Sequence, residues 1–193
     1  TGLWRDGCGA TAPDGCKPEN ALTGQISWFE NTTSILVPAA YKNYRFWRNT
    51  SVALLGAGQT ATLPAGTLGY EWDWEQPAYA VNNPSGRFTL SSTTVTGKTH
   101  KLSLYRHSSG ALVFGAGTIQ WSWGLDGTHD RGVSTPSVIM QQATVNLFAD
   151  MGVQPATLQA GLVAATASTD LTPPASVITF PANGATLAPN VAV

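Results

Sequence analysis

Residues Gly110–Asp130 read GALVFGAGTIQWSWGLDGTHD, and this stretch carries the strongest structural signals in the chain. The short apolar run Ala111–Phe114 predicts one strand. Ile119–Trp123 alternates apolar and polar side chains, which predicts a second strand, because side chains on a strand repeat with a period of two. The loop that follows carries Asp126, His129 and Asp130.

A helix is expected directly after this loop, at Pro136–Met151. Thr135 and Pro136 supply an N-cap and a first-turn proline, and Gly152 supplies the stop. Its broad apolar face consists of Ile139, Met140, Ala143, Leu147, Phe148 and Met151. A short second helix is predicted at Pro155–Val163.

Strands followed by a loop and a helix predict an α/β, β-rich fold, in which ligands bind where strands run into helices. His129 and Asp130 are therefore candidate catalytic residues. His129 has the chemistry of a general base or metal ligand, and Asp130 that of an acceptor for helix N-terminal amides. The plainer interpretation, which we favour, is a surface histidine and an aspartate that orders the loop.

Further strands are predicted from short apolar or aromatic runs, and a hairpin is expected around Gly97-Lys98. The hairpin joins Arg87–Thr96 to Thr99–Arg106, so His100 and His107 are expected as exposed strand residues, and Tyr79–Gly86 is expected to be a loop. The other strand predictions are Gln25–Phe29, Ser34–Val37, Tyr44–Trp47, Gln59–Leu63 and Thr67–Trp74.

The composition of the 193 residues limits the class of protein. Only 11% are charged and the formal net charge is −1, so the chain has no basic stripe for a nucleic-acid backbone. No apolar run is long enough to span a bilayer. Few charges and many small hydroxyl residues indicate a secreted, β-rich protein, and the start at Thr1 without a methionine indicates a processed product or a fragment.

Cys8 and Cys16 are the only cysteines, in CGATAPDGC. In an oxidising compartment they are expected to form a disulfide. The alternatives are two free thiols or half of a metal site. Towards the other end, Asp170–Pro174 predicts a linker, and Val177–Phe180 predicts the first strand of a further β module.

Several stretches in order resemble one family. They are Gly2–Asp6 (GLWRD), Pro18–Gly24 (PENALTG), Phe46–Thr50 (FWRNT), Gly69–Asp73 (GYEWD) and Leu112–Leu125, with the helix of Met140–Val153. Together they are similar to the C-terminal domain of N,N-dimethylformamidase large-subunit-like proteins, over about residues 1–166. The remainder, 167–193, resembles a linker and the first strand of a bacterial immunoglobulin-like module in a secreted multi-domain protein.

The resemblance implies the later part of a layered, glutamine amidotransferase-like (ThuA-like) domain with one main helix and a β-strand tail. The enzyme that names the family hydrolyses an amide C–N bond with iron held by tyrosines and a glutamate. Glu71 is the residue to which this role transfers, as catalyst and metal ligand; its alternative is a carboxylate hydrogen-bonded to a loop. An earlier family motif of the GHDEYW type is absent, so the isolated chain is expected to be inactive.

Two non-catalytic alternatives remain open. Extracellular binding would use tryptophan rings as contacts for a sugar, although alternating tryptophans are more often core packing. Self-association would use uncovered sheet edges, and other domains of the parent chain are further expected partners. The candidate contact residues are Trp72, Trp74, Trp121 and Trp123.

Overall fold

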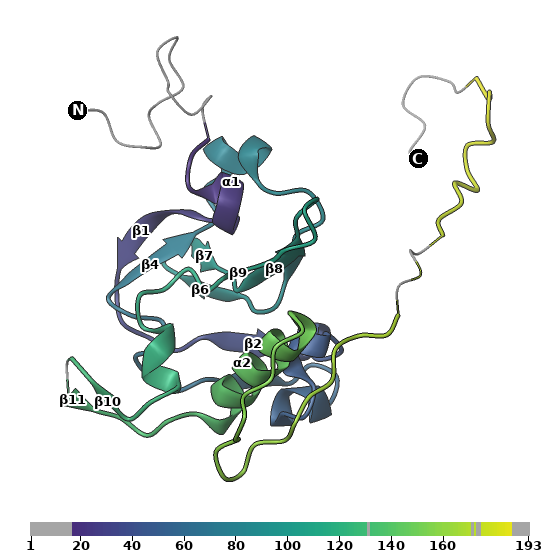
Figure 1. Ribbon diagram of the computed structural model, residues 1–193. Coiled ribbons are helices and arrows are strands. Elements are labelled where there is room, and N and C mark those ends of the chain that lie inside the picture. Colours follow the sequence, from purple (N-terminus) through teal and green to yellow (C-terminus); the bar gives the residue numbers. More distant parts are fainter. Residues whose placement is uncertain (1–16, 131, 171, 173–174, 187–193) are drawn as a thin grey trace.

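The computed structural model describes residues 17–130, 132–170, 172 and 175–186 (Figure 1). The predicted Cys8–Cys16 disulfide lies outside these residues. The chain forms short strands and few helices, so the predicted mixed, β-rich class is confirmed, whereas the glutamine amidotransferase-like layering is not. Every strand pair among the described residues is antiparallel.

The strands form small antiparallel groups: β1–β4, β2–β3, β6–β7, β10–β11 and β5–β8–β9. Their bounds are β1 Ile26–Glu30, β2 Leu36–Pro38, β3 Thr60–Thr62, β4 Glu71–Trp74, β5 Phe88–Thr89, β6 Thr93–Val95, β7 Lys98–His100, β8 Ser103–Arg106, β9 Leu112–Gly115, β10 Thr128–His129 and β11 Gly132–Val133. The helices are α1 Asn20–Thr23 and α2 Val138–Asp150, with 3-10 turns η2 Ala39–Tyr41, η3 Arg45–Trp47, η4 Ser51–Leu54, η5 Pro77–Asn82 and η6 Trp121–Gly124.

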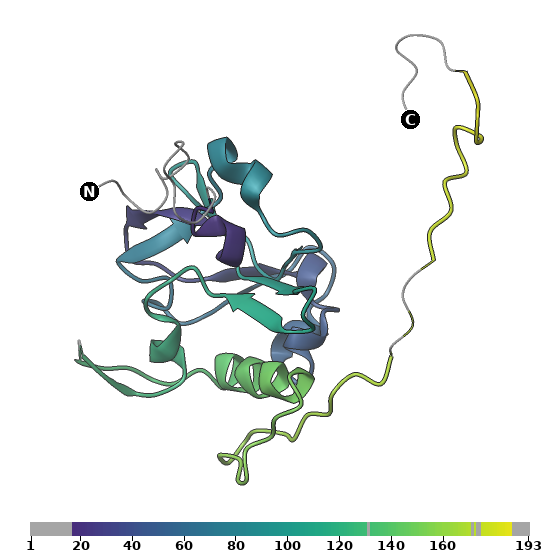
Figure 2. The ribbon, with the colours of Figure 1, turned by 45° about the horizontal axis from the view of Figure 1, so that its top comes forward.

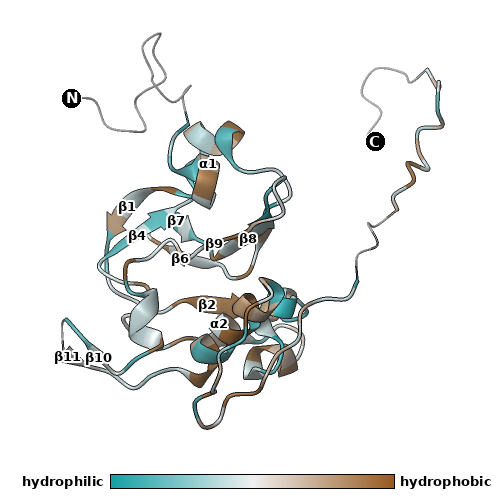
Figure 3. Cartoon of the chain, viewed as in Figure 1, coloured by the Kyte–Doolittle hydropathy of each residue, from teal (hydrophilic) through white to brown (hydrophobic). Residues whose placement is uncertain are grey.

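Single hydrogen bonds join these groups around one core. Asp73 N donates to Gly117 O (2.8 Å), and Glu75 N donates to Thr99 O (3.0 Å), so the end of β4 contacts both the β9–η6 connection and β7. The core consists of Ile35, Val37, Phe46, Trp47, Val52, Leu63, Leu68, Trp72, Leu90, Leu102, Leu104, Met140, Ala143 and Leu147. Figure 3 shows the apolar colouring of β2 and of parts of α2, which both contribute to this core.

Helix α2 confirms the prediction for Pro136–Met151 to within two residues and lies along one side of the strand region (Figure 2). Its N-cap is Ser137, whose Oγ accepts from Met140 N (3.3 Å), and not Thr135. Gly152 follows the helix with φ +82°, which favours glycine. Phe148, which was expected on the apolar face, is exposed. The helix is instead covered on a second side, which does not include Phe148.

That second side is covered by the segment after the helix. Val145 and Ala149 pack against Ala165, and Val163 N donates to Gln142 Oε1 (2.7 Å). The second helix predicted at Pro155–Val163 is wrong, because the segment consists of turns and irregular structure that follow the surface of α2.

The FWRNT motif anchors the end of α2. Arg48 makes a two-pronged ion pair with Asp150 (2.8 and 2.9 Å) and donates to Thr166 O (3.1 Å). Asn146 Nδ2 donates to Phe46 O (2.9 Å). The motif residues therefore hold together α2 and the segment after it.

Two strand predictions before α2 are wrong. Tyr44–Trp47 contains the 3-10 turn η3, and Ile119–Trp123 runs into the 3-10 turn η6. At the end of η6 the backbone of Gly124 lies directly against Met140 of α2, since a Cβ on Gly124 would lie 2.2 Å from Met140 Sδ. The alternating residues therefore lie in a tight turn, with Trp121 packed against the core, and do not form a strand.

The predicted hairpin exists as β6–β7, but its turn is Thr96-Gly97, one residue earlier than expected. Both residues have positive φ (47° and 78°), as a two-residue hairpin turn requires.

The linker region continues beyond the core as an irregular segment that leads away from the domain (Figures 1 and 2). Val177–Phe180 forms no strand, so the immunoglobulin-like module is not confirmed. Within the part of the chain that the structure describes, none of the helices has the length and apolar character of a membrane span.

Candidate functional site

Glu71 begins β4 and is exposed at the surface. Its register partner on β1 is Glu30, and directly opposed residues on paired strands have Cβ atoms about 4.5–5.5 Å apart on the same face. Glu71 and Asp73, two residues apart on one strand, line the same hollow of about 270 Å³. The best family-based candidate therefore lies in an acidic surface hollow.

The described residues do not complete an iron site at Glu71. They contain no group of three or more histidine, cysteine, aspartate or glutamate side chains arranged to hold a metal ion. Glu71 and Asp73 supply two carboxylates at most, fewer protein ligands than a catalytic metal normally has.

His129 and Asp130 lie on or next to the β10–β11 hairpin, which projects from the domain well away from β4 (Figure 1). His129 stacks on Trp123 (centroids 4.0 Å apart, planes 8° apart) and contacts Ser134 Oγ through Nε2 (3.1 Å). The Ser134 hydroxyl donates to Trp123 O (3.1 Å), so its single proton is used and Nε2 must be the donor. In this arrangement His129 fixes the hairpin and does not act as a base towards Ser134.

Asp130 is exposed, and the N-cap of α2 is Ser137, seven residues further along the chain. The candidate catalytic residues Glu71 and the His129–Asp130 pair lie on different parts of the domain, at β4 and at the β10–β11 hairpin (Figure 1).

The four tryptophans proposed as ligand contacts have different environments. Trp72 is only 1% exposed and meets Phe29 edge to face, so its ring is core packing. Trp121 packs against Phe114, and Trp123 against His129. Trp74 is half-buried and lines a larger pocket together with Glu75 and Arg87.

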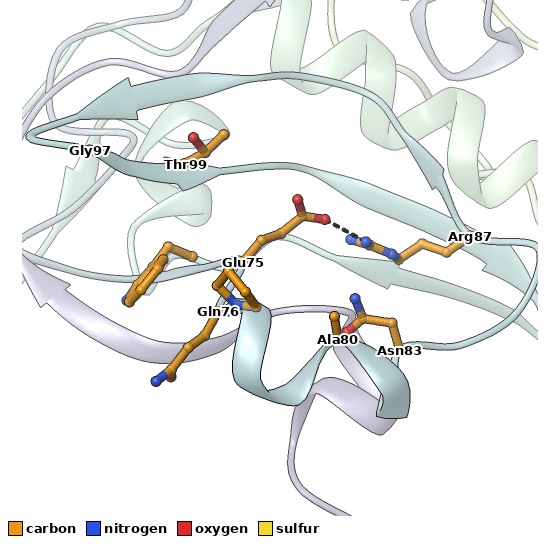
Figure 4. Close-up of a pocket in the computed structure, with 9 residues that line it drawn as sticks. Glu75, Gln76, Ala80, Asn83, Arg87, Gly97 and Thr99 are labelled. Carbon is orange, nitrogen blue, oxygen red and sulfur yellow. Dashed lines mark hydrogen bonds and ion pairs between the residues drawn. The ribbon is translucent and has the colours of Figure 1, made fainter. Parts of the chain in front are cut away.

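This pocket, called the Trp74 pocket below, has a volume of about 550 Å³. It lies between the end of β4, the turn η5 and the β6–β7 hairpin, and Figure 4 shows its side chains. Its lining residues are Trp74, Glu75, Gln76, Pro77, Ala80, Asn83, Arg87, Gly97 and Thr99.

Glu75 is the electrostatic centre of the pocket. Its carboxylate pairs with Arg87 Nη2, as the dashed line in Figure 4 marks, and with Lys101 Nζ (2.5 Å). Burial raises the pKa of the Glu75 carboxyl, but the hydrogen bonds and charges of Lys101 and Arg87 outweigh burial and hold that pKa below its usual value. Glu75 is therefore ionised at neutral pH and unsuited to act as a proton donor.

Arg87 reaches Glu75 by passing over Gly24, the residue that ends α1. A Cβ there would lie 2.4 Å from Arg87 Cδ, and Gly24 has φ +81°, so both the space and the backbone require glycine. Arg87 Nη1 is buried and has no hydrogen-bond partner among the described residues. One guanidinium donor is thus left for something other than Glu75.

The neutral polar groups of the pocket are oriented by neighbours. Asn83 Oδ1 accepts from Asn20 Nδ2 (2.8 Å), and Gln76 Oε1 accepts from Ser27 Oγ (2.7 Å). In each amide the oxygen is engaged, which fixes the side chain and leaves the NH2 group to donate.

Sequence reasoning missed this pocket. Glu75, Arg87 and Lys101 are separated by 12 and 14 residues, and no local motif links them; Tyr79–Gly86 was interpreted only as a loop. It also missed His100, expected as exposed but fully buried, with Nε2 2.8 Å from Ala116 O. His107 is exposed as predicted.

The fold and site together define a β-rich domain with a surface pocket that contains charged and polar side chains, and its described residues include no cluster of metal-ligating side chains. Residues 1–134 match the family described as N,N-dimethylformamidase beta subunit-like, C-terminal. The chain belongs to this family. No curated protein and no solved structure shows significant similarity to it.

Proposed function

We propose that this chain is a non-catalytic binding domain of a secreted, dimethylformamidase-like bacterial protein, and that it binds a small polar ligand in the Trp74 pocket. The observation that supports this is the pocket's lining, which combines the Trp74 indole ring with the Glu75–Arg87 ion pair; the Glu75 carboxylate also pairs with Lys101, outside the lining. Small-molecule pockets of roughly 300–1,000 Å³ typically combine apolar walls with a few fixed polar groups.

A ligand screen by NMR tests this proposal on the full chain. We expect small polar molecules from a mixed set of sugars, amides and organic acids to shift the Trp74 indole and Asn83 amide signals saturably. Trp74→Leu should abolish the effect, whereas Trp123→Leu, in η6 and outside the pocket lining, should leave it unchanged. Shifts confined to other parts of the domain, or no shifts at all, would contradict the proposal.

A second candidate is amide C–N hydrolysis by the full-length protein, with Glu71 as an iron ligand. It is favoured by the family membership and by the shared hollow of Glu71 and Asp73. Under this proposal the remaining ligands come from outside the described residues, and the isolated chain releases no amine from formamides.

The full-length protein decides between the two candidates. If Glu71 is a ligand, Glu71→Gln should remove bound iron and hydrolysis together, because the amide lacks the charge that binds a cation. Glu30→Gln changes the opposing carboxylate outside the hollow and serves as the control. Full iron content and activity in the Glu71 variant would discard this residue as the site.

A further inference from the structure

We propose that the ligand of the Trp74 pocket is a carboxylate-bearing sugar, a uronic acid unit. The inference rests on the binding function proposed above and specifies its ligand class. Three properties of the pocket carry it: an excess of positive charge, an excess of hydrogen-bond donors, and one aromatic wall.

The charged side chains in and around the pocket carry an excess of positive charge. In the lining, Glu75 pairs with Arg87, and its carboxylate also pairs with Lys101, which lies outside the lining. A third cation outside the lining, Lys98 Nζ, lies 5.7 Å from the centroid of the Trp74 ring and 4.5 Å from that of Phe29. An anionic ligand is therefore favoured beside Trp74 over a neutral or cationic one.

The uncommitted hydrogen-bonding groups are mainly donors. The buried Arg87 Nη1 has no partner among the described residues, and the oxygens of Asn83 and Gln76 already accept from Asn20 and Ser27. The pocket thus offers a guanidinium N–H and two amide NH2 groups. A carboxylate complements the guanidinium, and hydroxyl oxygens spread around a ring complement amides that come from separate positions.

The Trp74 ring adds the third property. A half-buried indole in a polar pocket provides a flat apolar surface, against which the C–H face of a pyranose ring packs. A small inorganic anion would leave this surface unused. The acid group and the ring together select a sugar acid.

The test compares cellobiouronic acid with cellobiose, which differ by one carboxylate, in titrations monitored by calorimetry and NMR. We expect the acid to bind at least about tenfold more tightly at low salt, with the advantage falling as salt screens the charges. Asn83→Asp keeps the oxygen that accepts from Asn20 but adds a negative charge. It should weaken binding of the acid about tenfold and leave the melting temperature nearly unchanged.

Asn82→Asp is the matched control, because Asn82 is the last residue of η5 and directly precedes Asn83 but does not line the pocket. It should leave the affinity for the acid within about twofold. Equal loss in both variants would show that general charge, not the pocket, determines binding.

The remaining outcomes separate failure of the proposed ligand class from failure of the proposed binding function. Equal affinity for the two disaccharides, or equal affinity for benzoate and the sugar acid, overturns the inference while the binding function stands. If neither sugar binds but another small molecule shifts the Trp74 and Asn83 signals, the ligand class is wrong and the binding function again stands. If no ligand shifts these signals, both fail.

Discussion

Removing the titratable group at His100 should flatten the acid side of the domain's stability profile. The His100 side chain is fully buried, and Ala116 O can only accept, so Nε2 must carry the proton. Nδ1 is buried without a partner among the described residues. Protonation of His100 would therefore place a charge in the core beside Trp72, at an atom with no acceptor.

The magnitude follows from the pKa. Burial, only partly offset by the hydrogen bond to Ala116, lowers the pKa of His100 from 6.5 to about 4. As the pH falls below 6.5 the unfolded chain binds a proton that the folded chain does not, so the free energy of unfolding decreases until the pH approaches 4. At about 1.4 kcal/mol per pKa unit, the total loss is on the order of 3 kcal/mol, a large fraction of typical domain stability.

Urea unfolding at several pH values between about 7.5 and 4.5 measures this loss in the wild type, His100→Gln and His107→Gln. The His100 variant should be less stable at neutral pH, because its packing changes. Its further loss down to about pH 5 should nevertheless be smaller than that of the wild type by ~2 kcal/mol. His107 is exposed, so His107→Gln is the matched control, and the stability of this variant should fall with pH as that of the wild type does. Parallel profiles for the wild type and His100→Gln would refute the reasoning.

Three more outcomes are expected. Glu71→Lys should raise the free energy of unfolding by about 0.2–1 kcal/mol, because it replaces the like-charge pair with Glu30 by an attractive one. A lower free energy of unfolding than that of the wild type, measured by urea denaturation, would argue against that pairing. Gly124→Ala should cost about 1–3 kcal/mol through its clash with Met140, and the same substitution should cost less in a Met140→Ala background, in a double-mutant cycle of unfolding free energies. Limited proteolysis should cut within 167–172 and leave the rest intact; first cuts inside the β6–β8 region, read by mass spectrometry, would contradict this.

The elements that the sequence predicts well are those with several local signals. Helix α2 has an apolar pattern, polar start residues and a terminal glycine, and each acts within a few residues of the others. The β6–β7 hairpin likewise has a turn glycine between alternating residues. By contrast, Ile119–Trp123 has the period of a strand but runs into η6, at the end of which Gly124 lies directly against Met140 of a distant helix.

The candidate site was less predictable, for a physical reason. Glu71 could be selected because the GYEWD motif resembles a family pattern, whereas the pocket beside Trp74 is assembled by tertiary contacts between segments without a shared motif. The burial of His100 was also not evident, because both sides of the chain around it are covered by other segments. Self-association through sheet edges stays a prediction.

The contacts of Arg48 bear on which part of the chain is an autonomous folding unit. The family match ends at residue 134, but Met140 and Leu147 belong to the central core, and Arg48 is held by Asp150 and by Thr166 O. A recombinant polypeptide cut to the homologous region would expose that core and leave the guanidinium of Arg48 without its partner. The family match identifies the residues that are related to other proteins. Cooperative folding also requires the residues that complete the core, which extend some thirty positions further on.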